Sequence, residues 1–232
     1  MIVTSLNKKE LVIKDLGLIP YDAAYVLQQN CVQQVLAGGP PILLLCEHPA
    51  VLTLGRLASW ENVLYSQEQI AARGIKIIAI DRGGEVTLHS PGQLVVYPIL
   101  NLNEHGKDLK SYLRKLEDVA IDFLLEFDIL AFNVLGKTGV WVYPDPSKSY
   151  PPKKIVSVGV GVKKWISYHG IAINILTDLS LFSLIRPCGL DAVMTSIADL
   201  KRQNVDFNLA KQKFVEVFRR HFDFYTQQGH KL

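Results

Sequence analysis

The residue best suited to covalent chemistry in this chain is a cysteine held between a proline and a glycine. Cys188 follows Pro187 and precedes Gly189. Proline restricts the backbone on one side, and glycine allows a substrate or another backbone to approach on the other. Because the position belongs to neither an apolar helix face nor a predicted strand, its thiol is a candidate nucleophile. A buried structural thiol is the alternative.

The other two cysteines have a different setting. Cys31 falls on the apolar side of a predicted helix, and Cys46 ends an apolar run that predicts a strand covered on both faces. Free cysteines behave as small hydrophobic side chains and are often buried. We therefore expect both to be core residues. Three scattered cysteines predict neither a disulfide framework nor a zinc site.

A cysteine nucleophile needs a neighbouring cation or base, because the thiolate is the reactive form and a free thiol has a pKa of about 8.5. The sequence offers three candidates, His89, His169 and Lys154. Histidine is the commoner partner of a catalytic cysteine, but a desolvated lysine can also exchange a proton. Lys153 competes with Lys154 for such a role. A lysine pair where a loop enters a strand is otherwise a solvated strand end.

A glycine-rich stretch, RGGEVTLHSPGQ, occupies residues 82–93. Its first two glycines allow a turn whose amides point at a ligand, but it matches neither a Rossmann fingerprint nor a P-loop. His89 within it is either a site residue or a hydrogen-bonded turn histidine. Residues 157–159 and 169–171 lie on the two arms of a predicted hairpin, where they can face each other. Ordinary hairpin packing is the alternative for these two segments.

These motifs together resemble one family, the lipoyl(octanoyl) transferases, or octanoyl-[acyl-carrier-protein]:protein N-octanoyltransferases. The match comprises residues 82–93, Lys154-Ile-Val-Ser-Val-Gly, Tyr168-His-Gly and Pro187-Cys-Gly. A Glu47-His-Pro turn followed by Thr-x-Gly is a further family signature. The resemblance extends from residue 47 to residue 196. It implies an α+β fold, a mixed sheet with flanking helices similar to the catalytic domain of biotin and lipoate protein ligases.

The resemblance also implies an activity. Such an enzyme moves an octanoyl group from octanoyl-acyl carrier protein to the ε-amine of a lysine on a lipoyl domain, as the first step of protein lipoylation. Cys188 would carry the acyl group as a thioester, and Lys154 would lower the thiol pKa and exchange protons. Thioester and amine chemistry needs no cofactor and no metal. The expected acceptors are the lipoyl domains of 2-oxoacid dehydrogenase complexes and the glycine cleavage H protein.

The resemblance assigns the acyl pocket and the contacts to the thioester to two groups of residues. They are Arg82, Gly83, Gly84, Glu85, Val86, Thr87, Leu88 and His89, and then Ser157, Val158, Gly159, His169, Gly170 and Ile171. Leu88 stands where the family commonly has an aromatic residue. His48 is expected near the site rather than in the chemistry.

Two other functions compete with this one. The first is an ATP-dependent lipoate-protein ligase on the same fold, which forms an adenylate and needs no cysteine. Two motifs do not belong to the ligase pattern and therefore disfavour this alternative. They are Pro-Cys-Gly at 187–189 and Thr-x-His-x-Pro-Gly-Gln at 87–93. The second is a binding module that holds acylated partners without reacting. An intact-mass measurement after mixing with octanoyl-acyl carrier protein distinguishes the transferase from the module.

Composition places the chain in a broad class. It has 232 residues, 49% of them hydrophobic, and a net charge of +3. This length predicts a single catalytic domain over residues 1–232. The charge is too small to indicate nucleic-acid binding. The N-terminus lacks the apolar core of a signal peptide, and no apolar run is long enough to span a bilayer. We therefore expect a protein of the cytoplasm.

Periodicity predicts helices at 20–37, 108–127 and from about 208. A short helix is expected after Ser66, which has capping-box spacing to Gln69, and another is expected to begin at Thr195 or Ser196. Strands are expected at 11–16, 42–46, 51–54, 75–80 and 139–143, with a hairpin at 154–175. Residues 85–89 and 94–97 are expected to pair with each other, with Pro98 ending the second strand. In the first helix, glutamines 28, 29, 33 and 34 are assigned to the polar face. No repeat or linker divides the chain.

In the helix predicted at 108–127, Leu109 and Leu113 belong to the apolar stripe, and charged residues such as Glu117 are assigned to the remaining, solvated face. Lys107, Lys110, Arg114 and Lys115 are close in sequence. They either steer an acidic carrier protein towards the site or form an ordinary solvated face.

Overall fold

A computed structural model describes residues 10–145, 147–187, 192–203 and 205–224. The helices and 3₁₀ turns among them are α1 Tyr21–Leu36, η1 Trp60–Asn62, α2 Gln67–Ala71, η2 Leu102–His105, α3 Leu109–Leu125, η3 Leu179–Leu184, α4 Ile197–Lys201 and α5 Phe207–Phe222. The strands are β1 Val12–Leu18, β2 Ile42–Glu47, β3 Val51–Leu54, β4 Lys76–Ala79, β5 Val86–His89, β6 Gln93–Ile99, β7 Ala131–Val134, β8 Lys137–Val142, β9 Lys153–Lys163 and β10 Ile166–Asn174.

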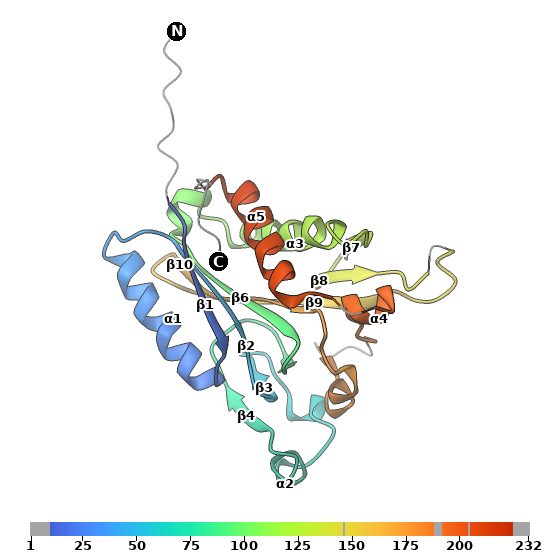
Figure 1. Cartoon of the computed structure of the whole chain (residues 1–232). Coiled ribbons are helices and arrows are strands. Elements are labelled where there is room, and N and C mark those ends of the chain that lie inside the picture. The colour runs from blue at the N-terminus through green and yellow to red at the C-terminus, as the bar shows by residue number, and fades with distance from the viewer. Residues whose placement is uncertain (1–9, 146, 188–191, 204, 225–232) are drawn as a thin grey trace.

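A seven-stranded mixed sheet, in the order β1-β2-β6-β10-β9-β8-β7, forms the centre of the fold. Of the neighbouring strands in this sheet, only β1 and β2 pair in parallel, and the other pairs are antiparallel. Helices α3 and α5 bury their apolar stripes on one face, and α1 covers the other (Figure 1). Helices thus cover both faces of the central strands, so β6 is buried along its length and β2 is buried up to Glu47. The α+β prediction is confirmed.

A second sheet, in the order β4-β3-β5, lies at one end of the large sheet (Figure 1). Its core includes Leu52, Ile70 and Leu88 and continues to Phe182 and Met194 from later in the chain. The predicted pairing of residues 85–89 with 94–97 is wrong. β5 pairs with β3, while β6 crosses to the large sheet and pairs with β2 and β10. The turn between them carries the chain from one sheet to the other instead of closing a hairpin.

Pro98 does not end β6, which continues to Ile99 with Pro98 opposite Leu43. The hairpin of β9 and β10 is confirmed, with Gly159 opposite Gly170 and Val158 opposite Ile171. Strand β7, which pairs with β8 at one edge of the large sheet, was not predicted. Its residues are only partly buried, so the short segment carries little hydrophobic signal.

Capping signals predicted several helix starts correctly. Ser66 and Gln69 form the expected reciprocal capping box at α2. Ser196, one of the two residues predicted to begin the short helix α4, is its cap. The last helix starts slightly earlier than expected, because Asp206 accepts hydrogen bonds from the amides of Asn208 and Leu209. None of the helices in the described part of the chain is both long and apolar enough to cross a membrane.

Two assignments of polar residues to solvent are wrong. Gln28 in α1 is fully buried, and its side-chain oxygen accepts a hydrogen bond of 2.8 Å from the amide of His169 in β10. Glu117 in α3 is also buried, and it accepts from the amide of Gly139 at 2.8 Å and from Arg114 at 2.7 Å. In both cases a strand amide that faces a helix requires an acceptor, and the helix supplies a side chain.

Replacing Gln28 with leucine should lower the free energy of unfolding by about 1–3 kcal/mol, because the buried amide of His169 loses its acceptor. Chemical denaturation of the two proteins measures this difference. Gln33 lies exposed on the same helix, so Gln33→Leu is the matched control and should change stability by less than about 0.5 kcal/mol. Equal effects of the two substitutions would contradict the role given to Gln28.

Candidate active site

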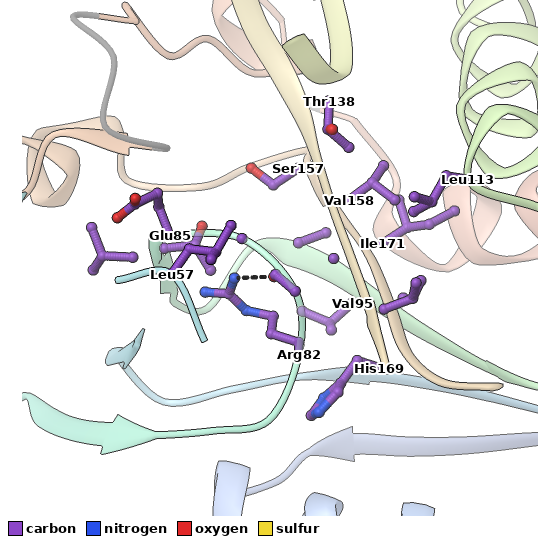
Figure 2. A pocket seen from close by; sticks show the side chains of 18 of the residues that line it. Leu57, Arg82, Glu85, Val95, Leu113, Thr138, Ser157, Val158, His169 and Ile171 are labelled. Carbon is purple, nitrogen blue, oxygen red and sulfur yellow. Dashed lines mark hydrogen bonds between the residues drawn. The ribbon is translucent and has the colours of Figure 1, made fainter. Parts of the chain in front are cut away.

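One cavity of about 460 Å³ gathers most of the residues that the sequence assigned to an acyl pocket. All the predicted pocket residues line it except Leu88, whose side chain lies in the core of the small sheet. Its walls come from residues 82–89, β6, the start of α3, the β7–β8 turn and the β9–β10 hairpin. Figure 2 shows Arg82 and His169 at one end of the labelled group and Thr138 and Ser157 at the other.

The loop of residues 80–85 between β4 and β5, here called the Arg82 loop, forms the wall on the side of the small sheet. The guanidinium of Arg82 donates to the carbonyl of Thr53 at 2.9 Å and to the carbonyl of Gly83 at 3.0 Å. The amide of Gly83 in turn bonds the carbonyl of Val160 in β9. A side chain at Gly159 would meet the Arg82 side chain at 3.0 Å. Glycine there is what allows the loop to lie directly on the hairpin.

His89 is the first of two buried histidines in the wall. Its Nδ1–H donates to the side-chain oxygen of Gln93 at 2.7 Å. Gln93 donates to Asn174 at 2.9 Å, and Asn174 donates to the carbonyl of Thr195 at 3.0 Å. Burial lowers the pKa of His89 to about 3, so its ring is neutral near pH 7 and its Nε2 is an acceptor.

His169 is the second, and it has a left-handed backbone, with φ of 55°, inside β10. Its Nε2–H donates to Asp81 at 2.8 Å, and its Nδ1 accepts from the Tyr21 hydroxyl at 3.2 Å. Tyr168 donates to the other oxygen of Asp81 at 2.6 Å. Burial also lowers the pKa of His169. Near neutral pH, therefore, neither histidine is placed to act as a cation.

Lys154 and Lys153 have opposite environments. The side chain of Lys154 is only 1% exposed, and its Nζ lies 5.7 Å from the ring centre of Trp141 on the paired strand. Lys153 is partly exposed and forms an ion pair of 3.6 Å with Asp199. Lys154 borders the cavity wall rather than lining it. A Cβ placed on Gly139, next to the lining residue Thr138, would lie 2.7 Å from the Cε of Lys154.

Cys188 lies outside the described residues, but the chain on both sides of it is placed. The amide of Arg186 bonds the carbonyl of Asn62, whose side chain donates to Glu85 in the cavity wall. After the gap, the amide of Lys154 bonds the carbonyl of Val193 at 2.8 Å. The amide of the residue two positions further on, Thr195, bonds the carbonyl of Lys154 at 2.9 Å.

The other two cysteines are buried, as expected. Burial raises the pKa of the thiols of both Cys31 and Cys46, the latter inside β2. His48 is also buried, and its Nε2 accepts from the Tyr97 hydroxyl at 2.7 Å. Its ring lies 5.6 Å from that of His89. His48 therefore does not line the cavity but packs against His89, which does.

Comparison with known proteins shows which family the chain belongs to. The model of the lipoyl protein ligase A/B catalytic domain matches residues 20–219. The chain belongs to this family. It is 43% identical over 209 residues to an octanoyltransferase of Syntrophotalea carbinolica, covering 89% of this chain and 92% of the relative. Another octanoyltransferase, from Thermosynechococcus vestitus, is 42% identical and covers 89% and 88% of the two chains. This identity makes the chain an acyltransferase.

A solved structure shares the fold at much lower identity. The crystal structure of lipoate-protein ligase A bound with ATP superposes with a TM-score of 0.67 at 13% identity, covering 96% of this chain and 88% of that one. At this identity the similarity concerns the fold alone. It confirms the expected ligase-like arrangement of a mixed sheet with flanking helices.

Several residues that line the cavity were not predicted from the sequence. Tyr21, Val95 and Tyr97 line the cavity from α1 and β6, and Leu109, Leu113 and Thr138 line it from α3 and β8. The periodicity of the apolar residues assigned Leu109 and Leu113 to the core. The packing of α3 against the β9–β10 hairpin leaves Leu109 and Leu113 at the cavity. The pattern of the sequence carries no signal that separates these two environments.

The low pKa of His89 predicts a specific acid sensitivity. Below pH 6.5 the unfolded chain takes up a proton at His89, while the folded protein does not until about pH 3. The free energy of unfolding should therefore fall by about 1.4 kcal/mol per pH unit as the pH drops through this window. His48 and His169 contribute with the same sign, since burial lowers their pKa as well.

Replacing His89 with glutamine should make the loss of stability on acidification shallower by about one proton. Chemical denaturation between pH 4 and pH 6.5, over the upper part of this roughly 3.5-unit window, measures the slope for each protein. The comparison uses slopes because the substitution also changes stability at neutral pH. An unchanged slope would contradict a neutral, buried His89.

Proposed function

We propose that this protein transfers an octanoyl group from an acyl carrier protein to the ε-amine of a lysine on a lipoyl domain, through a thioester on Cys188. The observation that carries the proposal is the cavity itself. It is lined by the family's Arg-Gly-Gly and hairpin motifs, and its wall adjoins a buried lysine. Val158, Ile171 and Leu113 give the side towards α3 an apolar surface suited to an acyl chain (Figure 2).

The reaction has two halves. In the first, the Cys188 thiolate attacks the carbonyl carbon of the carrier thioester, and the carrier's thiolate leaves with a proton from Lys154. In the second, the target lysine's amine attacks the new thioester, loses a proton to the Lys154 amine and expels the Cys188 thiolate. The enzyme returns to its starting state without a nucleotide or a metal. Dividing one transfer into two easier steps is the advantage of covalent catalysis.

The environment of Lys154 supports its role as the partner of Cys188. The two histidines of the cavity wall are neutral near pH 7, so they supply no positive charge to a thiolate. Lys154 is buried, and residues 193–195, shortly after the Pro-Cys-Gly motif, hydrogen-bond to its backbone. A buried ammonium beside a thiol stabilises the thiolate and lowers the thiol pKa. Lys153 is held by Asp199 instead.

The proposed partners are acidic acyl carrier proteins as donors and lipoyl domains as acceptors. Lipoyl domains of 2-oxoacid dehydrogenase complexes and the glycine cleavage H protein are the acceptors we propose. The ligase alternative predicts that transfer needs ATP, so omission of ATP from the assay discriminates directly. Transfer from the octanoyl carrier without ATP supports the transferase, and strict dependence on ATP supports the ligase.

Replacing Lys154 with alanine should lower the rate of Cys188 acylation by about a hundredfold or more, as expected for loss of a proton-transfer group. The same variant should show a raised thiol pKa when the rate of alkylation is followed against pH, because the thiolate loses its neighbouring cation. Lys153→Ala is the matched control and should change neither quantity appreciably. Equal losses in the two variants would mean that neither lysine is the specific partner.

Cys188→Ala should abolish both the octanoyl adduct and turnover. Intact-mass spectrometry after mixing with octanoyl-acyl carrier protein detects the adduct, and transfer to a lipoyl domain measures turnover. Cys31→Ala and Cys46→Ala are the controls. They should keep the adduct and reduce mainly stability, because burial raises the pKa of both thiols. Substantial transfer by the Cys188 variant would refute the acyl-enzyme mechanism.

A further inference from the structure

The start of α3 and the β7–β8 turn form one rim of the cavity, and this rim exposes apolar side chains. Leu109 at the start of α3 lines the cavity and is 40% exposed. Gly136 and Lys137 line it from the turn, and the preceding residue, Leu135, is 92% exposed. A leucine this exposed at the tip of a turn contributes almost nothing to the core.

Lysines adjoin these leucines in the sequence, and the one carboxylate next to Leu109, that of Asp108, accepts hydrogen bonds from the first amides of α3. Lys137 belongs to the same turn, and Lys110 follows Leu109 on α3. Arg114 lies four residues after Lys110 and therefore on the same helix face. Its side chain is about half exposed, although it also pairs with the buried Glu117 at 2.7 Å. The rim thus combines apolar and positive groups beside an opening to the acyl cavity.

Lys115, which the sequence grouped with these cations, belongs to a different surface. Its Nζ lies 4.7 Å from the ring centre of Phe222 in α5. Lys110 and Lys115 therefore lie on different surfaces, although they carry the same charge and are close in sequence. This difference allows a local docking site to be distinguished from long-range steering.

The opposite rim has a different character. Leu57 lines the cavity there and is 70% exposed, and Trp60 is 51% exposed on the following turn. The exposed charges nearby are mixed, with Arg56 and Glu61 on the same segment and Glu85 in the wall. An acidic partner is therefore favoured by the α3 rim and not by this one.

We propose that the donor, an acidic protein bearing the acyl group on a flexible arm, docks on the rim formed by Leu109, Lys110, Leu135 and Lys137. Its carboxylates pair with the lysines, an apolar side chain covers Leu135, and the arm enters the cavity past Leu109 and Gly136. The lipoyl domain does not need this surface. This inference rests on the proposed acyl transfer and adds the surface by which the donor is recognised.

The test compares a protein donor with a small one. Rates are measured with octanoyl-acyl carrier protein and with the octanoyl thioester of N-acetylcysteamine, which has no protein to dock. Leu135→Glu and Lys110→Glu should each raise KM for the carrier by about tenfold or more. Both should leave the rate with the small thioester unchanged, which also shows that the variants are folded.

Each variant has a control of equal charge change. Leu130 is 81% exposed at the other end of β7, so Leu130→Glu matches Leu135→Glu, and Lys115→Glu matches Lys110→Glu. Both controls should keep KM for the carrier within about twofold of the original protein. Identical effects of Lys110→Glu and Lys115→Glu would reduce the proposal to general steering and overturn it.

Two other outcomes also overturn the docking proposal. One is an unchanged KM for the carrier in Leu135→Glu and Lys110→Glu. The other is a raised KM for the lipoyl domain with an unchanged KM for the carrier, which would assign the rim to the acceptor. Failure of the underlying function has a separate signature, because the unsubstituted protein would then form no adduct with either donor.

Discussion

The cavity depends on the contact that holds the Arg82 loop of the small sheet against the hairpin of the large sheet. Asp81 accepts hydrogen bonds from Tyr168 and His169, and the amide of Gly83 bonds the carbonyl of Val160. These bonds connect two sheets that share no strand pairing with each other. Without them the loop would have no fixed position over the hairpin, and the cavity would lose one wall.

This contact also explains a locally unfavourable backbone. His169 has a left-handed φ within a regular strand, which costs free energy for a residue other than glycine. Its ring is fixed by Asp81 and Tyr21, and its amide is bonded by the buried Gln28. Three tertiary contacts thus determine a conformation that the local sequence would not choose. The side chain is held at the cavity wall as a result.

Charge is distributed unevenly among the buried groups near the cavity. His89 and His169 satisfy their hydrogen bonds in the neutral form, and burial disfavours their protonation. Lys154 is buried near the start of β9, close to Gly139 and Trp141 of β8. A chain of side-chain amides from His89 through Gln93 and Asn174 reaches the segment that pairs with Lys154. The cavity wall and the lysine are therefore parts of one hydrogen-bonded framework.

Local features of this protein can be predicted from its amino-acid sequence. Cap residues such as Ser66 and Ser196 and the apolar stripe of α3 fixed helix positions, because these signals act over a few residues. The motif match named the glycine-rich loop and the hairpin residues of the cavity, but not the residues that α1, β6 and α3 contribute to it. Tertiary structure decided the rest. It paired β5 with β3, buried Gln28 and Glu117 beneath strand amides, and turned Leu88 into the core of the small sheet. Strand pairing and buried hydrogen bonds join residues far apart in the chain, so no periodicity or spacing encodes which partner each residue receives.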